Sequence, residues 1–167
     1  VIDVYDYWVT PKNNPSYQFY KAYIKNGIKD AISFADAVTC TTEQLKERVL
    51  EFNDNVTILP NALDLTQAQW NQETQHKPTI GWVGGLSHTY DIQLLRDQIK
   101  PICEDQGYRF LMGGHHEGHK VWYEMERYIT GEHRAKRPEW FNKREGTTAD
   151  KYGAFYSEMD IAIAPLS

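Results

Sequence analysis

Apolar residues in the first third of the chain form short runs, separated by segments in which apolar residues recur at helical intervals. The continuous runs predict strands near residues 1–5, 37–40 and 56–59. Thr41 and Gln44 fit a capping box that opens a helix after the second strand. A helix between the first two strands is predicted from apolar residues at Tyr20, Ile24, Ile28, Ala31 and Ala35.

The rest of the chain repeats this alternation. Strands are predicted at residues 79–83, 108–112, 138–142 and 160–165. The helices between them are marked by apolar residues at Ile92, Leu95 and Ile99, at Trp122, Met125 and Ile129, and at Tyr152, Phe155 and Met159. Alternating strands and helices of this length predict right-handed crossovers and parallel sheets, with ligands expected at the carboxyl ends of the strands.

A polar, glutamine-rich segment separates the two sets of elements. The sequence therefore predicts an α/β protein of two Rossmann-like parallel-sheet units, residues 1–65 and 79–167, joined by a linker or short solvated helix at 66–78. Both ends of the chain fall on predicted strands, so we expect each unit to be incomplete and the chain to be a piece of a longer protein.

Composition and charge disfavour several classes of protein for this chain. The 167 residues include 18 basic and 23 acidic ones, for a net charge of −5, and no basic face is evident, which disfavours nucleic acid as a partner. No run reaches the roughly 20 apolar residues of a membrane helix, and no secretory signal opens the chain. Cys40 and Cys103 are far apart and are expected to be reduced thiols of a cytoplasmic protein.

The candidate ligand-binding segment is residues 80–91, I-G-W-V-G-G-L-S-H-T-Y-D. Two glycines stand between a predicted strand and a predicted helix, where backbone amides and the helix dipole favour a phosphate. A plain tight turn explains the same glycines. The third glycine of a dinucleotide motif and the lysine of a P-loop are both absent. The candidate ligand-binding residues here are Gly84, Gly85, Ser87 and His88.

The stretch G-G-H-H-E-G-H at residues 113–119 invites a metal hypothesis, with His115 and His119 on one face of a helix. Gly118 interrupts that helix and the order of a zinc-protease motif is absent, so no metal site is predicted. We interpret the stretch as the next strand-to-helix loop, which would place Gly114 and His115 beside the first glycine loop.

Two charged features of the sequence are interpreted as structural and not as functional. Asp3 and Asp6 are spaced so that they do not share one face of a strand, and Asp6 is expected to end the strand and organise the following loop. The basic segment 132–138 lacks interleaved aromatic residues and is expected to be a solvated loop.

Several of these blocks, taken in order, resemble retaining nucleotide-sugar glycosyltransferases of the GT-B fold, family-four type, most closely the bacterial and phage-like members with a G-W-x-G-x-x-x-H stretch. The resemblance covers most of the chain. It is carried by the segments 35–45, 56–64, 79–92, 108–114 and 156–166.

The resemblance implies specific roles. Pro60, Asn61 and Asp64 would mark the crossing between the acceptor-side and donor-binding domains, and Gly84 and Gly85 would lie against the donor diphosphate. It implies a nucleotide-sugar as co-substrate, no metal and no other cofactor. The family's donor signature, which contains a glutamate, would follow residue 167, and its usual arginine after the glycine loop is replaced here by the segment 86–88.

The resulting hypothesis is a fragment of a hexosyltransferase-type enzyme that moves a sugar from a nucleotide donor to an unknown saccharide, lipid or protein acceptor. The catalytic residues are not assigned, and whether the fragment is active without flanking sequence is left open. The expected location is the cytoplasm, with contact at the inner face of a membrane left open. The alternative is a non-catalytic Rossmann-like module that binds a nucleotide or a protein.

Overall fold

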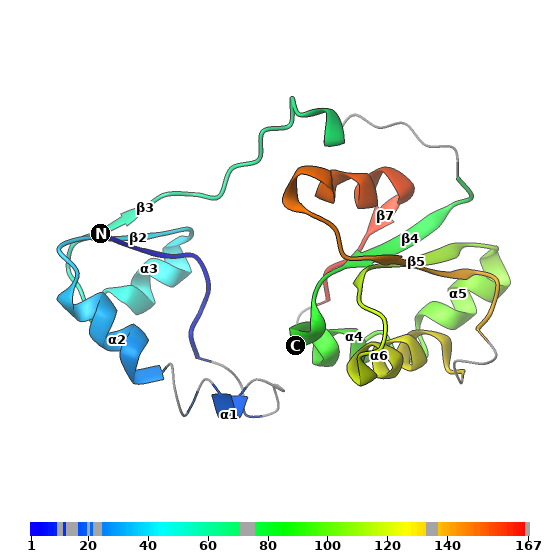
Figure 1. Ribbon diagram of the computed structural model, residues 1–167, viewed down its shortest axis with the longest axis horizontal. Helices are drawn as coiled ribbons and strands as arrows, with labels where there is room; N and C mark the ends of the chain where they lie inside the picture. The colour runs from blue at the N-terminus through cyan, green and yellow to red at the C-terminus, as the bar shows by residue number, and fades with distance from the viewer. Residues whose placement is uncertain are drawn as a thin grey trace. The chain divides into compact units, whose positions relative to one another are not determined.

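The chain forms two compact units, Val1–Leu63 and Asp64–Ser167, in the computed structural model (Figure 1). The structure describes residues 1–9, 12, 17–19, 21, 25–70, 76–132 and 137–165. Each unit has its own parallel sheet and its own core, which confirms the predicted α/β class with two parallel-sheet units.

The first unit contains a three-stranded parallel sheet in the order β1-β2-β3. Its strands are β1 Ile2–Val4, β2 Val38–Cys40 and β3 Val56–Ile58, and its helices are α1 Tyr17–Phe19, α2 Lys25–Phe34 and α3 Glu43–Val49. The strand register places the apolar residues on the face covered by α2 and α3 (Figure 1). The other face is polar, and Thr39 Oγ1 donates to Asp3 Oδ1 across it at 2.6 Å.

Two predictions for this unit differ from the structure. Thr42 caps α3 instead of Thr41, because its side-chain oxygen accepts from the Leu45 amide at 3.2 Å. The helix predicted from residue 20 is α2, which begins at Lys25; Tyr20 and Ile24 lie outside the described residues. Both differences shift an element boundary and leave the order of elements intact.

The second unit contains a four-stranded parallel sheet in the order β6-β5-β4-β7. Its strands are β4 Thr79–Val83, β5 Arg109–His115, β6 Phe141–Glu145 and β7 Ile161–Ala162. The chain adds β5 and β6 on one side of β4 and then returns to add β7 on the other side. A topological switch point therefore lies between β4 and β7, which is where open α/β sheets bind ligands.

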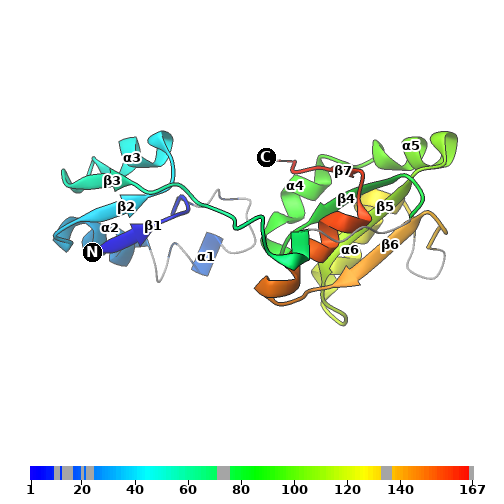
Figure 2. The ribbon, with the colours of Figure 1, turned by 90° about the horizontal axis from the view of Figure 1, so that it is seen from above.

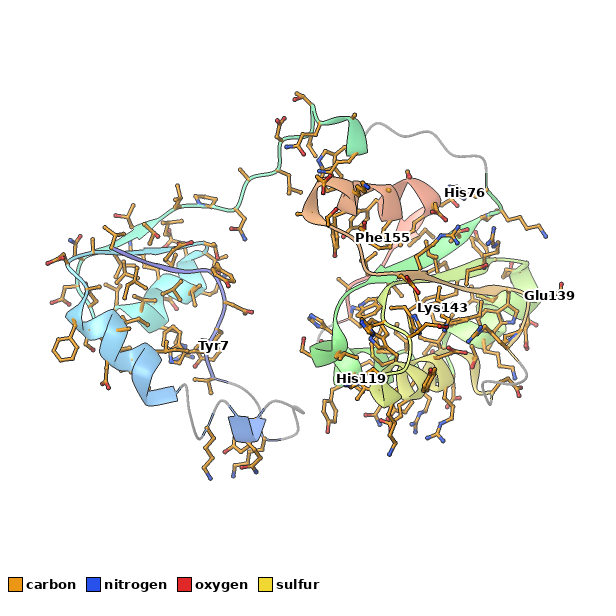
Figure 3. All side chains as sticks on the ribbon, in the orientation of Figure 1. Tyr7, His76, His119, Glu139, Lys143 and Phe155 are labelled. Atoms are coloured by element: carbon orange, nitrogen blue, oxygen red, sulfur yellow. The ribbon has the colours of Figure 1, made fainter. Side chains whose placement is uncertain are left out.

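Helices cover both faces of this sheet (Figure 2). The elements α4 Thr89–Gln93, α5 Ile99–Gln106 and α6 Lys120–Thr130 pack on one face, around a core that includes Trp82, Phe110 and Trp122. The 3₁₀ helix η5, Ala149–Glu158, lies on the opposite face, where Phe155 packs between it and the sheet (Figure 3).

Three predicted elements of this unit differ in detail. The single helix expected to carry Ile92, Leu95 and Ile99 is broken into α4 and α5, and Asp97 in the break has a φ of 63°. The helix expected over residues 152–159 is 3₁₀ in form, and the strand expected at 138–142 begins at Phe141.

Part of the expected linker belongs to the second unit. The short 3₁₀ helix η2, Ala68–Trp70, packs on η5, and Gln69 Oε1 accepts from the Gly153 amide at 2.8 Å. The Trp70 and Tyr156 rings are also in contact, with centroids 6.1 Å apart. Of the remaining linker residues, 71–75 lie outside the described residues.

Cys40 and Cys103 form no disulfide, as expected, and both are buried. Within the described residues, none of the helices has the length and apolar character to cross a membrane.

Candidate functional site

The loop that contains Gly84 and Gly85 lies at the switch point of the second sheet. β4 ends at Val83, the two glycines follow, and the 3₁₀ helix η3, Leu86–His88, runs directly into α4. Because β4 is the strand at which the chain reverses direction across the sheet, its carboxyl end borders the crevice that such folds use for ligands.

The two glycines have different surroundings. A Cβ on Gly84 would collide with the Trp82 indole, so packing inside the protein requires a glycine there. A Cβ on Gly85 would meet no atom of the described residues within 4 Å. Its φ of −106° and ψ of 179° are extended values that any residue adopts. Neither packing nor backbone conformation accounts for Gly85, and its open side faces solvent at the switch point.

The loop leads directly into the first turn of η3. Gly85 caps η3, and the His88 amide donates to the Gly85 carbonyl at 3.2 Å. The Leu86 and Ser87 amides stand in the first turn, where a helix leaves its N–H groups without an internal partner. Gly85 and Ser87 are exposed. An anion at this position can accept from these amides.

His88 is held in one orientation at the end of the loop. Its Nδ1 lies 2.8 Å from Asp91 Oδ2, and its ring makes an edge contact with Trp82, with centroids 6.2 Å apart. The His88 side chain is 46% exposed. With Nδ1 donating to Asp91, Nε2 is the ring nitrogen left for a ligand, and it donates when the imidazole is protonated. The negative charge of the Asp91 carboxylate, beside His88, repels an anion.

Gly114 joins this loop through a bulge in β5. The register of β5 with β6 shifts between Gly113 and His115, which makes Gly114 the extra residue. Its φ is +88°, and a Cβ on it would collide with the carbonyl oxygen of Gly84. The backbones of Gly84 and Gly114 therefore lie in direct contact at the carboxyl edge of the sheet. The bulge lies within the strand, where a loop was expected.

His115 lies away from this edge. The bulge turns its side chain toward α6, where the residue is 1% exposed and its ring packs on Trp122 with centroids 5.5 Å apart. Burial, reinforced by the Lys143 ammonium, lowers the pKa of His115. The site therefore brings together Gly84, Gly85, Ser87, His88 and Gly114 but not His115.

A partly buried cluster of charges, not predicted from the sequence, lies beneath β6. Lys143 Nζ lies 3.0 Å from His115 Nε2 and 3.9 Å from Glu126 Oε2. Arg137 makes a bidentate pair with Glu126, with Nε to Oε1 at 2.7 Å and Nη2 to Oε2 at 3.1 Å. Residue 137, from the segment expected to be solvated, is therefore anchored on α6. Lys143 is labelled in Figure 3.

The histidine-rich stretch does not assemble a metal site. His119 caps α6, with Nδ1 accepting from the Val121 amide, while His115 ends β5, so the two do not share a helix face. Among the residues that the structure describes, no group of three or more His, Cys, Asp or Glu side chains is placed to hold a metal ion.

Comparisons with known proteins leave the family of this chain open. A scan against protein-family models gives no match, and a search of curated protein sequences finds no relative.

Proposed function

We propose that this chain is part of a nucleotide-sugar-dependent glycosyltransferase of the GT-B type, with the Gly84–Gly85 loop against the donor diphosphate. The observation that carries the proposal is the position and open surroundings of Gly85. It lies at the switch point of a parallel sheet, and no contact with the residues that the structure describes explains the absence of a side chain. A glycine in such a place permits a ligand to approach the backbone.

The resemblance of the sequence blocks supplies the chemistry. In the proposed reaction an acceptor hydroxyl attacks the anomeric carbon of the donor sugar, the bond from that carbon to the diphosphate oxygen breaks, and the nucleoside diphosphate leaves. The hydroxyl proton is released to solvent or to a base. In the proposal, the amides of Leu86 and Ser87 stabilise the negative charge that develops on the leaving group.

The resemblance implies that the reaction requires no metal, and the proposal includes none. We expect EDTA to leave nucleotide binding unchanged.

The test is calorimetry of the chain with the diphosphates of uridine, guanosine and adenosine. We expect at least one to bind, and the substitution Gly85→Asp to weaken it by at least about tenfold, because a carboxylate would stand beside the phosphates. Gly27→Asp is the matched control, since Gly27 also has nothing within 4 Å of its Cβ position but lies on α2.

The outcome tests the nucleotide site itself. Equal binding by the wild type and by Gly85→Asp would overturn the diphosphate assignment. Hydrolysis or transfer of the matching nucleotide-sugar by the wild-type chain would favour the enzyme over a non-catalytic nucleotide-binding module.

A further inference from the structure

The second unit contains a cavity of about 410 Å³ at the amino ends of β4, β5 and β6. It is lined by residues at or just before the starts of these strands and by the C-terminal turn of α5. Because the strands are parallel, this edge of the sheet is opposite to the carboxyl edge that holds the Gly84–Gly85 loop. Small-molecule pockets have volumes of about 300 to 1,000 Å³. The unit therefore has a second place of ligand size, away from the glycine loop.

Two cationic side chains at this cavity lack a counter-ion. Arg109 is the first residue of β5 and is half-buried, yet its guanidinium has no hydrogen bond or ion pair with any residue that the structure describes. The same holds for the exposed ammonium of Lys77, which precedes β4. A guanidinium is built for bidentate recognition of a carboxylate, so these two side chains favour a carboxylate from a ligand.

The C-terminal end of α5 supplies the opposite charge. Gly107 caps the helix with a φ of 72°, and its amide donates to the Cys103 carbonyl at 3.1 Å. The later carbonyls of the last turn have no partner within the helix, and they carry the partial negative charge of its dipole. Glu104 adds a carboxylate whose exposed pair with Lys100, at 4.0 Å, is weak. Glu139, labelled in Figure 3, adds a second carboxylate to the lining.

The rest of the lining is aromatic or uncharged. Tyr108 and Trp140 are both half-buried, and the Trp140 ring packs edge-on against Phe141 of the core, with centroids 6.3 Å apart. Burial, reinforced by Glu104, raises the pKa of the Cys103 thiol to about 11, so this side chain is neutral at ordinary pH. The cavity therefore offers aromatic surface to an apolar group besides its two kinds of charge.

We propose that this cavity binds a free α-amino acid in its zwitterionic form. The ligand carboxylate accepts hydrogen bonds from Arg109 and Lys77. The ligand ammonium donates to Glu104 and to the last carbonyls of α5. An apolar or aromatic side chain of the ligand packs on Trp140. The two cations and two carboxylates of the lining balance, which favours a ligand without net charge over inorganic phosphate.

The proposal goes beyond the diphosphate site and does not depend on it. The cavity lies at the amino edge of the sheet, whereas Gly85 follows the carboxyl end of β4. We therefore expect Gly85→Asp to leave amino-acid binding unchanged, so that failure of either assignment is seen separately.

The test screens the full chain by saturation-transfer NMR against the L-amino acids with apolar or aromatic side chains, and measures the best ligand by calorimetry. Its N-acetyl derivative lacks the ammonium, and its amide lacks the carboxylate. We expect at least one amino acid to bind and each derivative to bind at least about tenfold more weakly, which corresponds to about 1.4 kcal/mol.

Variants of the chain test the two kinds of charge. We expect Arg109→Gln and Glu104→Gln each to weaken binding of the amino acid by about tenfold. Asp105→Asn is the matched control for Glu104→Gln, since Asp105 is the next, exposed residue of α5 and does not line the cavity. Arg48→Gln, which removes an exposed guanidinium from the first unit, is the control for Arg109→Gln.

Three results would overturn the proposal. One is a screen in which no amino acid binds at millimolar concentration. Another is an affinity that Arg109→Gln and Glu104→Gln leave unchanged while both variants remain folded by circular dichroism. The third is an N-acetyl derivative or an amide that binds as tightly as the free amino acid, which would show that the cavity does not recognise a zwitterion.

Discussion

Each of the three glycines at the candidate site lacks a side chain for a different reason. Gly84 leaves room for the Trp82 indole, and Gly114 leaves room for the Gly84 carbonyl while adopting a positive φ. Gly85 leaves room for nothing that the structure describes in the protein. The first two therefore hold the edge of the sheet together, and the third is available to a ligand. A substitution at each position should accordingly affect a different measurement.

Gly114→Ala should lower the free energy of unfolding by about 2 kcal/mol or more, because it combines a left-handed φ with a collision against a backbone carbonyl. Gly118→Ala is the matched control. Gly118 also has a positive φ, of 84°, but has nothing within 4 Å of its Cβ position, so only the conformational cost of about 1 kcal/mol applies. Urea denaturation measures both. Equal losses in the two variants would contradict the close approach of Gly84 and Gly114.

The buried His115 predicts a dependence of stability on pH. Burial and the Lys143 ammonium lower the pKa of its imidazole below the ordinary 6.5 in the folded state. The unfolded chain therefore takes up a proton at this residue at a higher pH than the folded chain does. The free energy of unfolding should fall as the pH drops below about 6.5 and be fully recovered above it.

His115→Gln should remove that part of the pH dependence while keeping an acceptor for Lys143. The measurement is urea denaturation at a series of pH values from about 5 to 8, a range that spans the ordinary histidine pKa. His116→Gln, a change at an exposed neighbour, is the control and should leave the slope as in the wild type. A slope that His115→Gln leaves unchanged would argue against a neutral, buried imidazole.

At the scale of elements, the periodicity of apolar residues located most strands and helices but missed two irregularities. The glycines at 113 and 114 predicted the end of a strand, whereas Gly114 forms a bulge and β5 continues to His115. A glycine inside a strand pattern is also a signal for a bulge, so the sequence held that information. The break between α4 and α5 at Asp97 has no such signal, because Ile92, Leu95 and Ile99 keep helical spacing across it.

The cluster of charges between α6 and β6 predicts a stability difference at this scale. Glu126 is 5% exposed and accepts from Arg137, with Lys143 also near. Glu126→Gln removes the charge that balances both cations and should cost about 2 to 3 kcal/mol. Glu158→Gln is the matched control, since its bidentate pair with Arg144 is far more exposed and should contribute less than about 1 kcal/mol. Thermal and urea unfolding measure the loss of unfolding free energy in each variant. Equal losses in Glu126→Gln and Glu158→Gln would contradict the role of burial.

At the scale of the whole molecule, the alternation of elements predicted two parallel-sheet units, and the structure has them. The strand order β6-β5-β4-β7 could not be predicted from residue patterns, because order depends on packing between elements that are distant in the chain. That order is what places Gly85 at a switch point. The cavity lined by Lys77, Glu104, Arg109 and Trp140 also could not be predicted from the sequence. Its walls come from segments about 30 residues apart in the chain.

The most direct test of the central claim locates a bound nucleotide on the second unit. The chain is labelled with ¹⁵N and titrated with the uridine, guanosine and adenosine diphosphates while the backbone amide signals are followed. The account predicts that the largest shifts, with at least one of the three, fall on the amides of Gly85, Leu86 and Ser87. No shift with any of them, or shifts confined to residues away from the carboxyl ends of β4 and β7, would contradict it.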